Sequence, residues 1–299
     1  MGGTLHGYLG RMVDVLHFTD PGCPWAWSAS PALAELRWRF GDGLRWRHVM
    51  IGLTESAEQY EKRGYTPLAS ALGHRRFHAY GMPFASHVKS RVSATAPACR
   101  VVVAARLRDP AIEWSTLRAL QIAHFTTAGR LEDRDDQRAA LERFGLPAEE
   151  LVAASDSDEV VAAYEADRAL ARTAADTPSS VQNRTANTDG AERFTAPSLV
   201  FDSNSSRMVA GGFQPFEAYD VVLAHLAPDL PRRTAPLNVA EMLAEFPEGL
   251  FTAEAARVLR AHHLDLPDVP DAEARLIEGV ATGAARRVDV GDSALWLAA

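Results

Sequence analysis

Two short apolar stretches flank a helical pattern near the start of the chain. Residues 13–18, VDVLHF, form an apolar run that ends at a Thr-Asp-Pro-Gly turn signal, as a buried strand does. From Pro24, apolar residues recur on one helical face, and Gly41 ends the helix. Residues 44–51, LRWRHVMI, alternate basic and apolar positions, which indicates a second strand. This strand–helix–strand order predicts a parallel pair with a right-handed crossover.

The pattern then turns helical for about 120 residues before strands return. Residues 54–176 contain only helical patterns, among them ACRVVVAARL and SDEVVAAYEADRALARTA, which predicts an α-helical insertion. Residues 176–194 are polar and rich in turn formers, so we expect a loop. The stretches 197–201 and 207–210 predict a β-hairpin, and the helical pattern of PFEAYDVVLAHL closes the unit at residue 226.

The rest of the chain predicts a linker and a small C-terminal module. Residues 227–236 are proline-rich and predict the linker. Residues 237–299 show three helical patterns followed by strand, turn and strand, an order that resembles a winged-helix domain. This module holds 11 acidic residues, five arginines and no lysine. Its net charge is therefore negative, which disfavours binding to the phosphates of a nucleic acid. We therefore expect packing or protein contact from it, and no nucleic-acid partner.

Composition sets the compartment that we expect. The net charge of −8 disfavours binding to nucleic acid or to an anionic membrane surface. The N-terminus lacks the pattern of a secretory signal, and no apolar stretch approaches the roughly 18 residues that cross a bilayer. The two cysteines, Cys23 and Cys99, are too few for a disulfide framework and suit a reducing compartment. The prediction is a soluble cytoplasmic protein.

The motif DPGCPWAW, residues 20–27, holds the most specific chemistry. Cys23 would stand at a helix N-cap, with Pro24 at the first helical position, where its missing N–H is not needed. Unpaired N–H groups and the helix dipole would then stabilise a thiolate, so we expect a Cys23 pKa below its usual value of about 8.5.

These residues and the element order around them resemble the DsbA-like branch of the thioredoxin fold. The likeness is greatest to FrnE-type and 2-hydroxychromene-2-carboxylate isomerase-like proteins, and it covers about residues 12–226. The resemblance implies an α/β thioredoxin-like fold with a helical insertion, and a cis-proline opposite the cysteine, which matches Pro197. It implies Cys23 as the catalytic residue and a thiol-binding site of Pro24, Trp25, Ala26, Ala196 and Pro197.

Ala26 departs from this family pattern, because C-P-W-A stands in place of C-P-W-C. A second cysteine would attack the mixed disulfide at Cys23 and release the substrate, and alanine cannot do so. Three functions stay open. The preferred one is a single-cysteine thiol–disulfide oxidoreductase acting on a small-molecule or protein substrate. An external thiol of the glutathione or mycothiol type resolves the mixed disulfide as a co-substrate, without a tightly bound cofactor. The others are a thiol-dependent transferase or isomerase, and a non-catalytic binding module.

Other chemistry-bearing residues give weaker signals. The sequence spacing does not place Cys99 near Cys23, and free cysteines are often core residues. We expect Asp20 to cap the local backbone. His74 and His78 share a helix face, but no further ligand follows at a recognisable spacing, so no metal is expected. A basic cluster that would suit a carboxylate-bearing thiol comprises Arg75, Arg76, His78, Lys89 and Arg91.

Overall fold

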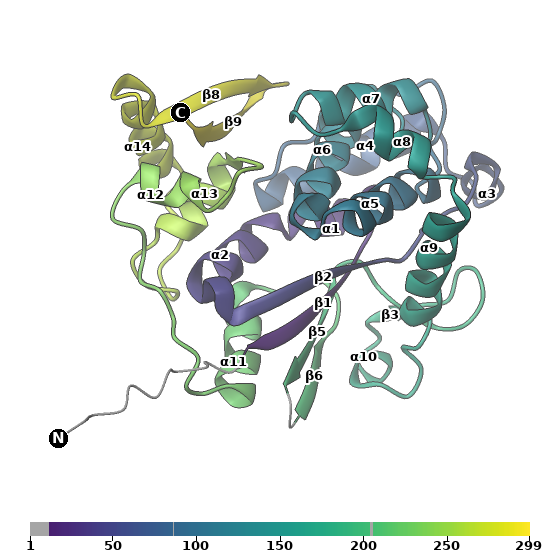
Figure 1. The fold of residues 1–299 in the computed structure, drawn as a ribbon, viewed down its shortest axis with the longest axis horizontal. Helices are drawn as coiled ribbons and strands as arrows, with labels where there is room; N and C mark the ends of the chain where they lie inside the picture. The colour runs from purple at the N-terminus through teal and green to yellow at the C-terminus, as the bar shows by residue number, and fades with distance from the viewer. Residues whose placement is uncertain (1–11, 86, 204–205) are drawn as a thin grey trace.

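A four-stranded sheet lies at the centre of the computed structural model, which describes residues 12–85, 87–203 and 206–299 (Figure 1). Its strands are β1 (Val13–Thr19), β2 (Leu44–Met50), β5 (Ser198–Ser203) and β6 (Ser206–Ala210). The spatial order is β2-β1-β5-β6. β1 and β2 are parallel, which confirms the sequence prediction, and Val13 stands opposite Leu44. β5 runs antiparallel to both β1 and β6.

Helices cover both faces of this sheet. The helices α2 (Ser30–Phe40) and α11 (Phe216–Leu226) pack on one face, and α9 (Asp158–Ala171) packs on the other beside β2 (Figure 1). Because successive side chains of a strand point to opposite faces, Val15 joins the α2–α11 core while Phe18 joins the core on the other side. The motif at the end of β1 is thereby held between two packed layers.

The helix predicted from Pro24 to Gly41 is broken in two. A short helix, α1 (Pro24–Ser28), ends at Ala29, and α2 begins at Ser30. Pro31 has no N–H to donate to the carbonyl group of Trp27, so the hydrogen-bond ladder cannot continue through it. The predicted stop is confirmed, since Gly41 caps α2 with a φ of 45°, a conformation that favours glycine.

Between β2 and β5 the described residues are mainly helical. Residues 54–85 and 87–176 contain no strand. Their helices before α9 are α3 (Ala57–Lys62), α4 (Pro67–His74), α5 (Ala96–Arg108), α6 (Glu113–Thr126), α7 (Arg134–Glu142) and α8 (Ala148–Ala154). The predicted loop at 176–194 is more ordered than expected, since it contains a short helix and a two-stranded ladder: α10 (Pro178–Val181), β3 (Thr185–Ala186) and β4 (Arg193–Phe194).

The C-terminal module, residues 237–299, has the expected helices and hairpin plus one more strand. Its elements are α12 (Val239–Ala244), β7 (Leu250–Phe251), α13 (Thr252–Leu259), α14 (Val269–Ala281), β8 (Ala285–Val290) and β9 (Ser293–Ala298). The strands form a sheet in the order β7-β9-β8. The two residues of β7 are too few to show an alternating pattern in sequence.

This module packs against α2 and does not stand apart as a separate unit (Figure 1). Trp38 of α2 shares a buried core with Trp296 of β9. Arg260, just after α13, donates two hydrogen bonds to the Glu35 carboxylate, at 2.8 and 2.6 Å. The predicted linker is irregular in structure, but a hydrogen bond holds it to α2: Trp38 Nε1 donates to Thr234 O at 2.8 Å.

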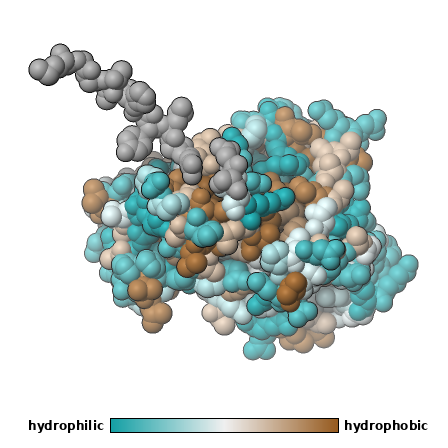
Figure 2. All heavy atoms as spheres, turned by 90° about the horizontal axis from the view of Figure 1, so that it is seen from below, coloured by the Kyte–Doolittle hydropathy of each residue, from teal (hydrophilic) through white to brown (hydrophobic). Residues whose placement is uncertain are grey.

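The surface mixes polar and apolar residues. Figure 2 views the side on which α10, α11 and β6 lie in Figure 1, and hydrophobic residues are interspersed there with hydrophilic ones. Val181 of α10 and Val221 of α11 are exposed apolar residues. Among the described helices, none has the length and apolar character that would cross a membrane.

Candidate functional site

Cys23 lies at the junction of β1, α1 and the segment that leads into β5. It is the N-cap residue of α1, with extended backbone angles, and Pro24 follows at the helix start. Its Sγ donates a hydrogen bond to Ala196 O, which is 3.2 Å away. The Ala196–Pro197 peptide bond is cis. The motif and the loop before β5, which are 173 residues apart in sequence, therefore meet at the sulfur atom.

The expected lowering of the Cys23 pKa is wrong. Only 6% of this residue is exposed, and burial raises the pKa of the thiol to about 12. The backbone N–H groups of Ala26 and Trp25 and the charge of Arg193 lower the Cys23 pKa, whereas the charge of Asp20 raises it. The helix start therefore acts in the predicted direction, but the loss of hydration outweighs it.

Asp20 organises the turn beneath Cys23. Its Oδ1 accepts a hydrogen bond from Gly22 N at 2.8 Å, which confirms the predicted capping role. Its Oδ2 accepts from Leu53 N at 2.8 Å and from Thr95 Oγ1 at 2.9 Å. Burial raises the pKa of the Asp20 carboxyl, while these hydrogen bonds lower it. Asp20 thus ties the cysteine turn to the start of α5.

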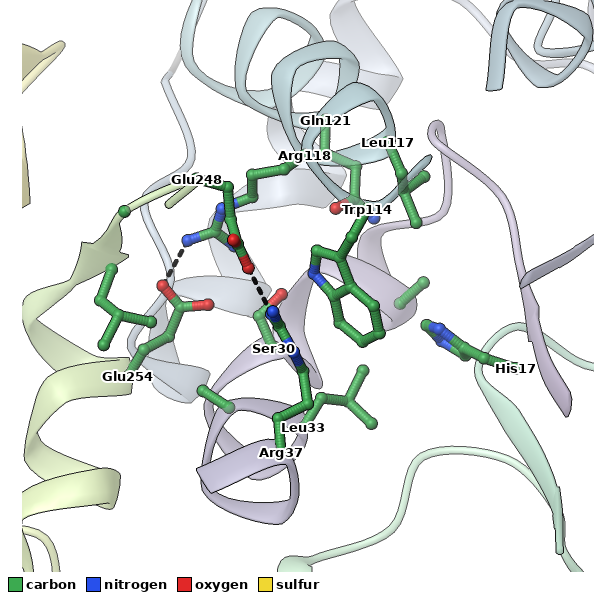
Figure 3. Close-up of a pocket in the computed structure, with 14 residues that line it drawn as sticks. His17, Ser30, Leu33, Arg37, Trp114, Leu117, Arg118, Gln121, Glu248 and Glu254 are labelled. Atoms are coloured by element: carbon green, nitrogen blue, oxygen red, sulfur yellow. Dashed lines mark hydrogen bonds and ion pairs between the residues drawn. The ribbon is translucent and has the colours of Figure 1, made fainter. Parts of the chain in front are cut away.

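Ala26, the position of the missing cysteine, faces inward. It lies on the wall of a small internal cavity of about 20 Å³, together with His17 and Trp114. Figure 3 shows the cavity between α2, α6 and the C-terminal module, where Arg37 pairs with Glu248 and Arg118 pairs with Glu254. A space of this size holds about one water molecule.

Cys99 makes a different hydrogen bond from Cys23. It is fully buried in α5, and its Sγ donates to Asp20 Oδ2 at 3.5 Å, whereas Cys23 Sγ is directed to Ala196. Both cysteines are free thiols. Burial raises the pKa of the Cys99 thiol well above its usual value, and the Asp20 charge adds to the rise.

A second and much larger cavity of about 690 Å³ opens beside Cys23. Gly22, Pro24 and Trp25 form one side of it, so the residues on either side of the cysteine line it. Trp25 is 37% exposed, and its ring packs edge-on against Phe77 with centroids 4.9 Å apart. Trp27 is completely buried, and its Nε1 donates to Pro83 O at 2.9 Å.

The predicted basic cluster is partly assembled in this larger cavity. Arg76, Lys89 and Arg91 line it, whereas Arg75 and His78 do not. Arg193 of β4, which the sequence analysis missed, lines it as well. The feature of the sequence that could have pointed to Arg193 is its position four residues before Pro197.

Three of the residues that the sequence indicated for the site, Cys23, Ala26 and Ala196, pack in one buried cluster. Cys23 meets Ala196 in a hydrogen bond, Pro24 and Trp25 line the large cavity, and Ala26 faces the small one. No group of three or more His, Cys, Asp or Glu side chains within the described ranges is arranged to hold a metal ion.

Solved structures with this fold come from several bacteria. One, the cytosolic disulfide reductase DsbM from Pseudomonas aeruginosa, is 20% identical with a TM-score of 0.50, covering 72% of this chain and 100% of that one. Another, assigned as a protein disulfide isomerase from Nitrosomonas europaea, is 19% identical with a TM-score of 0.55, covering 72% and 97%. A third, assigned as a DsbA oxidoreductase from Streptomyces coelicolor, is 20% identical with a TM-score of 0.51, covering 76% and 93%. At these identities the likeness shows the fold alone.

The family is shown by sequence. No curated protein matches the chain as a relative. The family model described as DSBA-like thioredoxin domain matches residues 14–177, more than half of the chain and the part that contains β1, the Cys23 motif and the helical insertion. With its sheet order and a cis-proline beside the motif cysteine, the chain belongs to the DSBA-like thioredoxin domain family.

Proposed function

We propose that this protein is a thiol–disulfide oxidoreductase that uses Cys23 as its single nucleophile and an external thiol to complete the reaction. The observation that supports this most directly is the position of Cys23 Sγ, at a helix start and 3.2 Å from Ala196 O beside a cis-proline. The cavity next to the motif offers room for the group that the substrate sulfur carries.

The reaction has two exchange steps. In the first, the Cys23 sulfur attacks a substrate disulfide R–S–S–R′, a bond forms between Cys23 and RS, and R′S⁻ leaves and takes up the proton that Cys23 loses. In the second, an external thiol R″SH attacks the same RS sulfur and forms R″–S–S–R. The Cys23 thiolate leaves and regains a proton. The two steps together convert R–S–S–R′ and one external thiol R″SH into R′SH and R″–S–S–R, so the R′ half of the substrate is reduced and one external thiol is oxidised.

In this proposal an external thiol carries out the second step, because neither candidate position in the chain offers an accessible sulfur atom. Ala26 has none, and the Cys99 thiol is buried and bonded to Asp20. The proposal includes a reducing compartment, the cytoplasm, where low-molecular-weight thiols are abundant.

The raised pKa of Cys23 favours a second candidate function. A buried thiol with a pKa of about 12 is almost entirely protonated at neutral pH, and thiols attack disulfides as thiolates. Under this second candidate the protein binds a thiol-bearing ligand in the large cavity without forming a disulfide to it, as a binding module or a thiol-dependent transferase or isomerase would.

Intact mass spectrometry separates the two candidates. The protein is incubated with an oxidised low-molecular-weight disulfide such as oxidised glutathione, and the same sample is then treated with the reduced thiol. The oxidoreductase proposal expects one added thiol on Cys23, its removal by reduced thiol, and no adduct on a Cys23→Ser variant. Binding of the reduced thiol with no adduct at any time supports the second candidate and contradicts the first.

A further inference from the structure

The large cavity beside Cys23 has a wall of unusual charge. It is formed by the cysteine motif, by α3, α4 and the turns of the insertion, and by β4. Its cations are Arg63, Arg76, Lys89, Arg91 and Arg193, and three histidines line it too: His74, His87 and His124. No aspartate or glutamate lines it within the described part of the chain.

This wall contrasts with the composition of the whole protein. The chain has 39 acidic and 31 basic residues, so a wall that follows the composition would contain several carboxylates. Clefts lined by charges of one sign concentrate ligands of the opposite sign. The wall therefore suits an anion, and one with more than a single negative charge.

Most of these cations keep their charge available to a ligand. Arg91 pairs with Glu132 at 2.6 Å, but the other four cations have no carboxylate within 4.0 Å in the described ranges. Lys89 Nζ donates to the backbone carbonyls of Thr127 and Gly129, which hold its ammonium group without neutralising it.

Arg193 is the most deeply placed of the five. Only 5% of it is exposed, and its guanidinium donates to Phe194 O at 3.0 Å while its Nε has no partner among the described residues. Burial lowers the pKa of Arg193, and the negative charges of Asp189 and Asp20 offset this only in part, so a further anion bound nearby would stabilise its guanidinium. Arg193 stands in the segment that leads to Pro197 and so places positive charge near Cys23.

We infer that the thiol which reacts at Cys23 carries several negative charges, as carboxylates or phosphates, and that the acid-free cavity recognises it through Arg76 and Arg193. The inference rests on the proposed function and narrows it, because it excludes uncharged sugar-based thiols as the preferred co-substrate. The exchange is the second step above: the anionic thiol attacks the mixed disulfide, takes over the RS group and returns the proton to Cys23.

The test measures how thiols of different charge resolve a mixed disulfide on Cys23 of the full chain. The protein is loaded with an uncharged 2-mercaptoethanol group as a mixed disulfide on Cys23, and recovery of the free Cys23 thiol is followed by intact mass with 2-mercaptoethanol, mercaptosuccinate or coenzyme A as the resolving thiol. Each rate constant is divided by that of the same thiol with the disulfide of 2-mercaptoethanol, which removes differences in intrinsic reactivity. The two anionic thiols should be faster than 2-mercaptoethanol by about tenfold or more at low salt, and lose this advantage as salt is added. If coenzyme A gains more in rate than mercaptosuccinate, the cavity prefers thiols that carry phosphate groups. If mercaptosuccinate gains more, the cavity prefers thiols that carry carboxylates.

Neighbouring arginines provide the matched variants. Arg76→Gln should slow only the anionic thiols, several-fold, whereas Arg75→Gln removes the same charge from a residue outside the cavity wall and should have little effect. Arg193→Gln should slow the anionic thiols more than Arg76→Gln does. If the Arg193→Gln variant does not fold, the rates of Arg76→Gln test the inference on their own. Equal normalised rates for charged and uncharged thiols, or equal effects of Arg75→Gln and Arg76→Gln, overturn the inference.

Failure of the exchange reaction itself is recognised separately. S-methyl coenzyme A has no thiol, so calorimetric titration measures its binding whether or not Cys23 reacts. One result keeps the anionic cavity and rejects the oxidoreductase proposal: salt-sensitive binding that Arg76→Gln weakens, together with no loading of Cys23 by the disulfide of 2-mercaptoethanol. Release by every thiol at equal normalised rates keeps the oxidoreductase and rejects the anionic cavity.

Discussion

At the scale of single residues, the reactivity of Cys23 is decided by burial. Its pKa of about 12 lies well above the roughly 8.5 of a free cysteine, so the thiolate is a far smaller fraction of Cys23 at pH 7 than of a free cysteine. Since the thiolate is the reactive form, the rate should rise about tenfold for each pH unit until the pKa is reached.

We therefore expect alkylation of Cys23 by iodoacetamide to be slower than that of free cysteine at neutral pH, and to keep rising above pH 9.0. The site of labelling is measured by peptide mass spectrometry across the pH range. Cys99→Ala shows how much of the signal comes from the second, fully buried thiol. A rate that reaches a plateau near neutral pH would contradict the burial argument.

Position 26 offers a test of what the second sulfur would add. Cys23 is the N-cap residue of α1 and Ala26 lies three residues on, a separation at which side chains on a helix are neighbours. The cavity of about 20 Å³ beside Ala26 leaves space close to that of one sulfur atom. On oxidation, the Ala26→Cys variant should form a disulfide between its new thiol and Cys23, and mixed disulfides at Cys23 should then be resolved without an external thiol.

Loss of two mass units and the absence of a lasting adduct would be measured in the Ala26→Cys variant. Ala29→Cys is the matched control, because it is also a buried alanine near α1 but lies six residues from Cys23. If adducts on Ala26→Cys persist as long as on the natural chain, the geometry for self-resolution is missing.

The sequence could predict which residues meet at this site but not the balance of forces on them. Cys23, Pro24 and Pro197 were identified from the motif and the family resemblance, and the structure brings Cys23 and Ala196 together. The sign of the pKa shift depends on how closely distant segments cover the sulfur, and a motif does not contain that information. Arg193 was missed for the same reason, since its place in the cavity depends on the fold of residues 176–194.

At the scale of elements, α2 joins the sheet to the C-terminal module through a buried charge. Glu35 has no exposed surface and accepts two hydrogen bonds from Arg260, while Arg39 and Arg257 lie 3.7 and 3.8 Å from it. Removing one partner of a buried ion pair leaves the other desolvated and uncompensated. The pattern of α2 predicts its apolar face, but only the fold shows which arginines meet its single glutamate.

We expect Glu35→Gln to lower the free energy of unfolding by about 3–5 kcal/mol, as loss of one partner in a buried pair does. Urea unfolding followed by circular dichroism measures the change. The comparison variant is Asp271→Asn, which breaks an exposed pair with Arg275 on α14 and should cost less than about 1 kcal/mol. A loss for Glu35→Gln as small as that of Asp271→Asn would show that the pair contributes little.

At the scale of the whole molecule, the boundary predicted at residues 227–236 does not separate two independent cores. Trp27 of α1 packs edge-on against Phe251 of β7 with ring centroids 5.5 Å apart, and it stacks with Phe125 of α6 at 5.8 Å. The proline-rich segment correctly predicted irregular structure. Composition could not show that Arg260 of this acidic module forms ion pairs with Glu35 and Glu217 of the preceding domain.

A shared core of this kind predicts that the module and the thioredoxin domain unfold together. Detaching the module would expose Trp27 and Trp38, which are almost completely buried, and would leave Glu35 without Arg260. Burial of a large side chain contributes about 2–3 kcal/mol, so detachment costs a substantial part of the 5–15 kcal/mol that typically stabilises a domain. Native-state hydrogen exchange should therefore give β9 and β1 the same free energy of opening. Glu35→Gln should lower both values together, whereas a fall in β9 alone would show that the module opens by itself while the sheet around Cys23 stays folded.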